Sequence, residues 1–293
     1  MKRILFLIFI SAQVINLHAQ LLWKITGNGL QHPSYLFGTH HLTPIQFLDS
    51  IPGLYKAFNS CEVIVSEMVV NNVDATARIQ QAAIMPDHIK ITDLMNESDC
   101  KLVDNELKAV LKFGLKEVSV MNPALILTLY ELEMFRKRAG YPNDSQSDSY
   151  FQLIAAEKGK KVVGLETVDQ QIAILFGNKS FQRQADLLVE TIQHKDSVLN
   201  EMLLAEKLYK AGKIDELVDL SSHKGNVLDL TEQEYSKLID ERNANWLTQL
   251  PSAMQTSPCF IAVGALHLGG KNGLLKKLQK AGYKVNLVKA AGS

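Results

Sequence analysis

Short apolar runs typical of strands lie near both ends of the chain, and longer segments with helical spacing lie between them. Strands are predicted where apolar and β-branched residues run together or alternate, at Leu22–Thr26, Tyr35–Phe37, Glu62–Ser66, Lys161–Val163, Phe260–Val263 and Tyr283–Val288. The first two flank Gly27-Asn28-Gly29, a turn-forming cluster. The start of the pattern therefore predicts a β-hairpin.

Helices are predicted where apolar residues recur at helical spacing, at Pro123–Ala139, Tyr150–Lys158, Ser180–Ala211, Glu232–Leu250 and Gly273–Ala281. Asn122 is expected to cap the first of these helices, with Pro123 at the first helical position. The segment Ser180–Ala211 carries charges throughout and predicts either two helices or one largely solvated rod. The polar stretch Asn143–Ser149 predicts a loop.

This order of elements predicts an α/β fold, with an α+β arrangement as the alternative. A central mixed sheet would be flanked by helices, with a large helical insertion between the groups of strands. No linker rich in Pro, Gly or Ser divides the chain. Residues 20–293 are therefore predicted to form a single domain.

Residues 1–19 predict a secretory signal peptide. Lys2 and Arg3 precede an apolar run, and Ala19 offers a cleavage site that would leave Gln20 as the new N-terminus. An uncleaved N-terminal anchor is the alternative, but the run is shorter than the ~20 residues of a comfortable membrane span. We therefore expect a secreted or periplasmic protein with no transmembrane span after cleavage.

Charge and cysteine content narrow the classes of partner. Loss of Lys2 and Arg3 with the signal leaves 29 basic and 31 acidic residues, so a nucleic-acid partner, which favours a concentrated basic surface, is not expected. The three cysteines, Cys61, Cys100 and Cys259, have no metal-type spacing and are expected to be structural. A Cys61–Cys259 disulfide remains an alternative if their strands are neighbours.

Two histidine segments from opposite ends of the chain share one plan. In both YLFGTHHL (35–42) and IAVGALHL (261–268), an apolar strand is followed by Gly, two spacers, His and Leu. Glycine permits a turn at the strand end, so His41 and His267 can project there instead of entering the sheet. His40 is the alternative to His41 as the inward-facing residue.

Two carboxylates also follow strands, Glu67 after EVIVS and Glu166 after VVGL. In α/β sheets, ligands bind outside the carboxyl ends of the strands. We therefore expect His41, His267 and Glu67 to ligate a divalent metal ion, with an open position for water. Manganese, cobalt and zinc all suit such N,N,O ligands.

The remaining carboxylate has two predicted roles. Glu166 is expected to act as a general base or to hold an imidazole in one tautomer, and a purely structural role is the alternative for both carboxylates. The other histidines, His32, His88, His194 and His223, are expected at the surface. The sequence contains no HExxH, nucleophile elbow, P-loop or Rossmann fingerprint.

At these residues the chain resembles the TraB/GumN family, which is related to the TIKI metalloproteases. The resemblance spans Leu21 to about Val288 and rests on the two Gly-x-x-His ends, SEM (66–68), GLET (164–167) and ERN (241–243). Two departures are the doubled His40-His41 and the Ser147 that precedes Asp148 where the family usually has glycine.

The resemblance implies an exported metal-dependent hydrolase, with a peptidase as the leading expectation. It places Glu67, Glu166, His41 and His267 at the reaction centre, while Arg242 and Asn243, together with His40, are expected to contact a peptide or small-molecule substrate. A non-catalytic protein that binds a metal, haem or a small ligand is the alternative. A partner-binding protein is a third hypothesis, motivated by the long charged helices between 180 and 250. The substrate, the metal and the oligomeric state are not set by the sequence.

Overall fold

The structure, a computed structural model, describes residues 20–70, 73–141, 147–222 and 228–289. The predicted signal peptide, residues 1–19, lies outside the described residues, so its prediction is not tested. The described strands are β1 (Leu22–Gly27), β2 (Ser34–Thr39), β3 (Val63–Ser66), β4 (Lys161–Gly164), β5 (Cys259–Gly264) and β6 (Tyr283–Leu287). They form one sheet in the order β4-β3-β5-β2-β1-β6.

The sheet is mixed, as predicted. Strands β4, β3, β5 and β2 run parallel to one another, so their carboxyl ends share one edge. Strands β1 and β2 form the predicted antiparallel hairpin, and β6 closes the far side against β1. Strand β5 lies at the centre of the parallel block and is buried along Cys259–Val263, which explains why it reads as a continuous apolar run.

Helical segments cover the sheet and extend beyond it. The α-helices are α1 (Leu54–Ser60), α2 (Val73–Ala82), α3 (Glu97–Leu111), α4 (Pro123–Ala139), α5 (Ser147–Glu157), α6 (Val168–Ile172), α7 (Phe181–Gln193), α8 (Lys195–Lys210), α9 (Ile214–Ser221), α10 (Glu232–Tyr235), α11 (Glu241–Thr256) and α12 (Leu274–Lys280). Short 3-10 helices are η1 (Ile45–Ser50), η2 (Ile91–Leu94) and η5 (Ala265–His267). Two π-helical segments are η3 (Ala173–Gly177) and η4 (Ser236–Asp240).

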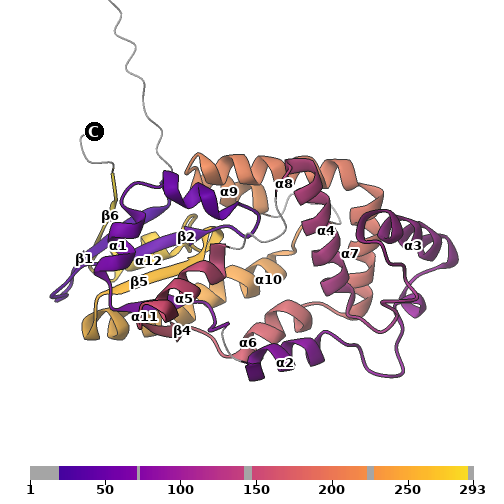
Figure 1. Ribbon diagram of the computed structural model, residues 1–293, viewed down its shortest axis with the longest axis horizontal. Coiled ribbons are helices and arrows are strands. Elements are labelled where there is room, and N and C mark those ends of the chain that lie inside the picture. The colour runs from indigo at the N-terminus through magenta and orange to yellow at the C-terminus, as the bar shows by residue number, and fades with distance from the viewer. Residues whose placement is uncertain (1–19, 71–72, 142–146, 223–227, 290–293) are drawn as a thin grey trace, which may run out of the picture.

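The main core lies between the sheet and its covering helices. Figure 1 shows α1 and α5 in front of the sheet and α11 and α12 behind it. On the front, Phe151 of α5 packs against Phe260 of β5 and Phe58 of α1, with ring centroids 4.9 and 5.5 Å apart. These three rings are fully buried, and their apolar area anchors both helices to the sheet.

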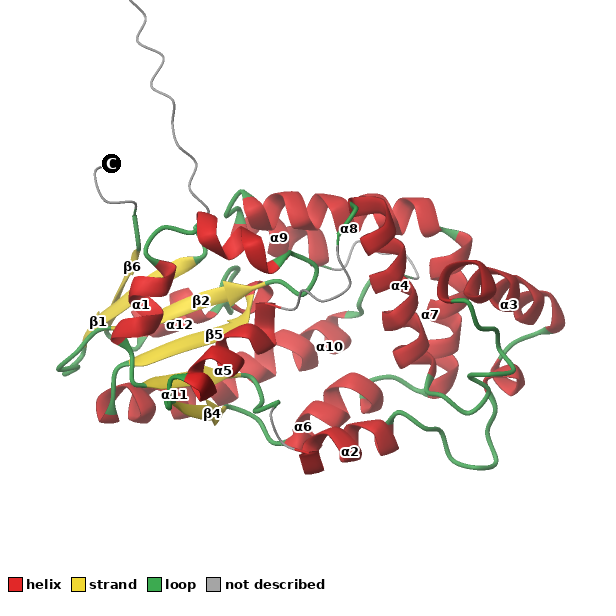
Figure 2. Ribbon diagram, viewed as in Figure 1, coloured by secondary structure: helices red, strands yellow, loops and turns green. Residues whose placement is uncertain are grey.

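A second apolar cluster forms away from the sheet. Its buried members include Val103 of α3, Ile126 and Tyr130 of α4, and Leu188 and Ile192 of α7. Figure 2 shows these helices at the end of the molecule opposite the strands. This is the predicted helical insertion, and it has an apolar core of its own.

Several local predictions can be compared with the structure. The Asn122 side chain accepts a hydrogen bond from the backbone N–H of Ala124 (3.0 Å), which confirms the predicted cap of α4. The segment predicted as two helices or one rod forms two helices, α7 and α8, separated at His194. The prediction of a loop over 143–149 is wrong at its end, because α5 begins at Ser147. Burial of Phe151 and Ala155 against the sheet outweighs the polar composition there.

Two further predictions need correction or completion. Helix α11 continues past Leu250 and through Pro251 to Thr256, because Met254 in its last turn is buried in the main core. The three cysteines are free: Cys259 is buried in β5, Cys61 is buried between α1 and the neighbouring strand β3, and Cys100 is partly exposed. Among the described residues, no helix combines the length and the apolar character needed to cross a bilayer.

Candidate active site

Polar residues from four parallel strands gather at one edge of the sheet. Thr39 ends β2, Glu67 follows β3, Glu166 follows β4, and His267 follows β5 in η5. The backbone N–H of Glu166 donates to the carbonyl of Glu67 (2.8 Å), so the two carboxylate-bearing segments stay paired beyond their strands. This is the convergence that the strand-end pattern predicted.

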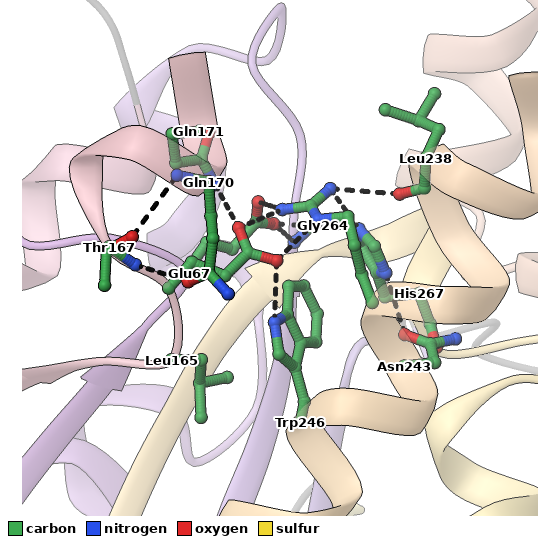
Figure 3. A network of polar contacts seen from close by, with 12 residues as sticks. Glu67, Leu165, Thr167, Gln170, Gln171, Leu238, Asn243, Trp246, Gly264 and His267 are labelled. Atoms are coloured by element: carbon green, nitrogen blue, oxygen red, sulfur yellow. Dashed lines mark hydrogen bonds and ion pairs between the residues drawn. The ribbon is translucent and has the colours of Figure 1, made fainter. Parts of the chain in front are cut away.

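Arg242 of α11 forms ion pairs with both carboxylates. Figure 3 shows the polar network at this edge, to which Glu67, Trp246 and His267 belong. The Nε of Arg242 donates to Oε1 of Glu166 (2.7 Å), and its Nη2 donates to Oε2 of Glu67 (2.5 Å). Its Nη1 donates to the carbonyl of Leu238 (3.1 Å), which belongs to the π-helical segment η4. A single guanidinium therefore holds three elements together.

The charges in this network are stabilised by one another. Burial alone would lower the pKa of Arg242, but the hydrogen bonds and charges of Glu166 and Glu67 raise it above its ordinary value. Burial would likewise raise the pKa of Glu67, but the electrostatic interactions with His267 and Arg242 and the N–H groups of Gly264 and Arg242 lower it. Arg242 is thus charged and Glu67 ionised at neutral pH.

His267 is buried, neutral and fixed in one tautomer. Burial lowers its pKa to about 3; the negative charge of Glu67 opposes this shift, and the positive charge of Arg242 adds to it. The amide Nδ2 of Asn243 donates to the carbonyls of His267 (3.1 Å) and Asn272 (3.0 Å), so its Oδ1 faces Nδ1 of His267 (2.8 Å). An amide oxygen only accepts, so Nδ1 carries the proton and Nε2 accepts from Nη1 of Arg242 (3.1 Å).

Glu166 supports Arg242 and has no acceptor position to spare. Its Oε1 also accepts from the indole N–H of Trp246 (2.9 Å), and its Oε2 accepts from Gln171 (2.5 Å). The Trp246 ring lies 4.3 Å from that of His267, centroid to centroid, and 4.8 Å from the guanidinium carbon of Arg242. Such contacts fix both groups in place.

A cavity of about 490 Å³ opens beside this network. Its polar lining includes His41, Glu67, Arg242 and His267, and its other walls are mainly apolar side chains of α8, α9, η4 and η5. A second cavity of about 130 Å³ is lined by His41 and Glu67 as well. The volume of the main cavity is in the range of small-molecule sites.

The two adjacent histidines of the first motif have different surroundings. The His40 ring stacks on Tyr209 at 4.9 Å between centroids, and its Nδ1 shares a hydrogen bond with the Thr43 hydroxyl (3.1 Å). His41 is exposed and lines both cavities. The backbone here is held by the Tyr209 hydroxyl, which donates to the carbonyl of Gly38 (2.9 Å).

The predicted metal ligands suit a divalent ion by their chemistry, because two imidazoles and a carboxylate line one cavity. Nε2 of His267 lies 4.0 Å from Oε1 of Glu67, so these two side chains would have to move closer to share a tetrahedral ion, whose ligands at ~2.1 Å lie roughly 3.4 Å apart. Within the described ranges, however, no group of three or more His, Cys, Asp or Glu side chains is placed to hold an ion. The metal site stays a prediction, with the condition that His41 approaches and Arg242 gives up Glu67 and His267.

The structure thus brings Glu67, Glu166, His267, Arg242 and Asn243 into one network and places His41 and His40 on the cavity beside it. Of the histidines expected at the surface, His32, His88 and His194 are exposed, and His223 lies outside the described residues. Sequence reasoning missed Trp246, Gln171, and the hydroxyls of Thr39 and Ser66, which have no hydrogen-bond partner within the described part of the chain. Trp246 follows Arg242 by one helical turn, and that spacing on an amphipathic helix is the signal that could have found it.

Comparison with known proteins agrees with the sequence motifs. The sequence model of the TraB/PrgY/gumN family matches residues 21–287, which is nearly all of the chain. Neither the curated proteins nor the solved structures contain a match to the chain. The chain belongs to the TraB/PrgY/gumN family.

Proposed function

We propose that this member of the TraB/PrgY/gumN family is an exported metal-dependent hydrolase of the peptidase type. The observation that carries the proposal is the cavity of about 490 Å³ that both Gly-x-x-His histidines, Glu67 and Arg242 line together. Convergent polar groups at one end of a mainly apolar cavity are the usual form of a small-molecule or peptide site. Export rests on residues 1–19 and would place the chain in a secreted or periplasmic compartment.

A divalent ion held by His41, His267 and Glu67 would lower the pKa of a bound water towards ~7 and so supply a nucleophile at neutral pH. The side chains around it have separate tasks. Asn243 fixes the ring of His267 through Nδ1, so that Nε2 is the nitrogen turned to Glu67 and Arg242. Arg242, once turned to substrate, would orient a carbonyl oxygen, because a buried guanidinium is a strong donor to developing negative charge.

Metal content and peptide cleavage test this proposal together. The wild-type protein, purified without chelator, should contain manganese, cobalt or zinc and cleave a peptide library. His41→Ala and His267→Ala should lose both properties, while His88→Ala, an exposed histidine remote from the cavity, should keep them. Full metal content and cleavage in both cavity variants would remove the proposal. Mass spectrometry of the mature protein should give Gln20 as its first residue.

A non-catalytic ligand-binding protein is the second candidate. The observation that favours it is that two of the proposed metal ligands already have a partner: Arg242 forms an ion pair with Glu67 and a hydrogen bond with Nε2 of His267. An absorbance titration with haem and a screen for ligands retained without turnover would support it. Peptide cleavage that depends on His41 and His267 would exclude it.

A further inference from the structure

Two buried hydroxyl groups at the strand ends have no hydrogen-bond partner among the described residues. Thr39 at the end of β2 is 2% exposed and Ser66 at the end of β3 is 4% exposed, and Oγ1 of Thr39 and Oγ of Ser66 are both without a partner. An unpaired buried hydroxyl costs free energy, so folded proteins usually pair such a group with the protein, with ordered water or with a ligand.

Both residues border the proposed reaction centre. Thr39 lines the main cavity and Ser66 lines the smaller one, and His41 and Glu67 line both cavities. In the sheet, Thr39 pairs with Gly264 and Ser66 pairs with Ala262. Positions 262 and 264 lie on the same face of β5, so the two hydroxyl-bearing residues share one face of the sheet.

The backbone that carries Thr39 is held from both sides. The carbonyl of Gly38 accepts the Tyr209 hydroxyl, and the following turn is tied by the Thr43–His40 bond. A Cβ at Gly38 would come within 3.0 Å of the Leu268 side chain and 3.2 Å of the Ala265 backbone, so this strand end cannot shift freely. A hydroxyl fixed in this way is preorganised for a ligand.

The remaining walls of the main cavity define the other half of the ligand. Most of them are apolar side chains, from Met202 and Ala205 of α8, Leu217 and Leu220 of α9, and Leu238 and Ile239 of η4, and two polar residues, Glu201 and Ser221, lie among them. A ligand that satisfies both sets of groups has a polar part at the strand ends and a bulky apolar part among these helices. A peptide with a large aliphatic or aromatic side chain next to the bound amide has that form.

We propose that Thr39 and Ser66 are substrate-binding residues, whose hydroxyls hydrogen-bond the amide groups of a peptide while its large apolar side chain occupies the main cavity. This inference rests on the proposed function only in using the same cavity. It names the substrate class, a peptide with a bulky apolar residue at the bound position, which neither the family match nor the strand-end pattern specifies.

Calorimetric binding of two defined probes, N-acetyl-leucyl-leucinamide and N-acetyl-glycyl-glycinamide, tests the inference without metal or cleavage. The leucine probe should bind wild type, and the glycine probe should bind at least tenfold more weakly. Thr39→Val and Ser66→Ala should each weaken binding of the leucine probe by about threefold to tenfold, the value of one hydrogen bond. Thr128→Val, an exposed hydroxyl on α4, should bind as wild type.

Thermal unfolding without ligand separates a binding role from a structural one. Thr39→Val removes an unpaired group and should unfold at the wild-type temperature or higher. Thr43→Val removes an equally buried but partnered hydroxyl and should unfold at a lower temperature. A loss of stability in Thr39→Val as large as that in Thr43→Val would overturn the inference.

The outcomes also separate this inference from the proposed function. Failure of wild type to bind the leucine probe, or equal binding by wild type, Thr39→Val and Ser66→Ala, would overturn it even if the enzyme contains metal and cleaves peptides. Weakened binding in those variants and in Ala205→Phe, which fills the apolar end of the cavity, would support it even if neither metal nor cleavage is found.

Discussion

Removal of the Arg242 side-chain charge should be among the most destabilising single changes near the sheet. The Arg242 side chain is 9% exposed, and Glu166, its main partner, is 2% exposed. Arg242→Met would leave Glu166 buried without its counter-ion and Glu67, which is 27% exposed, without its main partner. The same change would free the carbonyl of Leu238 and Nε2 of His267 from their donor.

The magnitude follows from the burial of Glu166. Breaking a buried ion pair by removing one partner costs about 3–5 kcal/mol, because the remaining charge stays in a poorly solvated site. Glu67 faces the cavity and contributes less, since water there screens its charge. A loss of about 3–5 kcal/mol is a large share of the ~5–15 kcal/mol stability of a typical domain, and it should lower the urea midpoint measured by circular dichroism.

A second substitution tests whether the unpaired charge of Glu166 causes the loss of stability. In the double variant Arg242→Met, Glu166→Gln, no charge remains at position 166, so part of the lost stability should return. The coupling free energy between positions 242 and 166, obtained from wild type, the two single variants and the double variant, should exceed about 1 kcal/mol. Lys101→Met is the matched control, because it breaks an exposed i,i+4 pair with Glu97 and should change stability by less than about 0.5 kcal/mol. A cost in Arg242→Met no larger than in this control, or no recovery with Glu166→Gln, would refute the reasoning.

Three further predictions concern pH, metal and thiols. The pKa of His267 falls from 6.5 to about 3 on folding, so between pH 3 and pH 6.5 the unfolded chain binds a proton that the folded chain does not. In this pH range the free energy of unfolding should therefore decrease as the pH falls, by up to ~1.4 kcal/mol per pH unit more in wild type than in His267→Gln, as measured by urea unfolding. Arg242→Met should bind Mn²⁺, Co²⁺ or Zn²⁺ more tightly than wild type by calorimetry, and equal affinity would show that Arg242 is no competitor. Burial raises the pKa of Cys61 to about 12 and that of Cys259 to about 11. A thiol reagent at pH 8 should therefore label only Cys100 in the folded protein and all three cysteines after denaturation. Labelling of a single cysteine after denaturation would instead indicate a Cys61–Cys259 disulfide.

The convergence of polar residues at one edge could be predicted because it depends on local order alone. A strand, a glycine and a histidine are adjacent in sequence at both ends of the chain, and the carboxylates follow their strands directly. Once four strands are parallel, their carboxyl ends meet without further information. The same local order could not decide between His40 and His41, since the stacking of His40 on Tyr209 joins residues far apart in the sequence.

The central role of Arg242 could not be predicted, because it depends on the rotation of one helix relative to the sheet. The ERN motif placed Arg242 and Asn243 near the site, but a motif does not show which neighbour a guanidinium meets. Helix α3 was missed for a related reason. Its charged positions hide the apolar face formed by Val103 and Leu107, which is buried in the second cluster rather than against the sheet.

One helical segment sets the geometry of the whole site. Arg242, Asn243 and Trp246 all lie in the first turns of α11, directly after the π-helical segment η4. A π turn contains one residue more than an α turn, and such turns recur at functional sites despite their poorer packing. Here the π turn is stabilised by a side-chain hydrogen bond, because the carbonyl of Leu238 accepts from the Arg242 guanidinium. Any change in the register of η4 would therefore move Arg242, Asn243 and Trp246 together. Since these residues hold the two carboxylates and His267, the site behaves as a single unit rather than as a set of independent contacts.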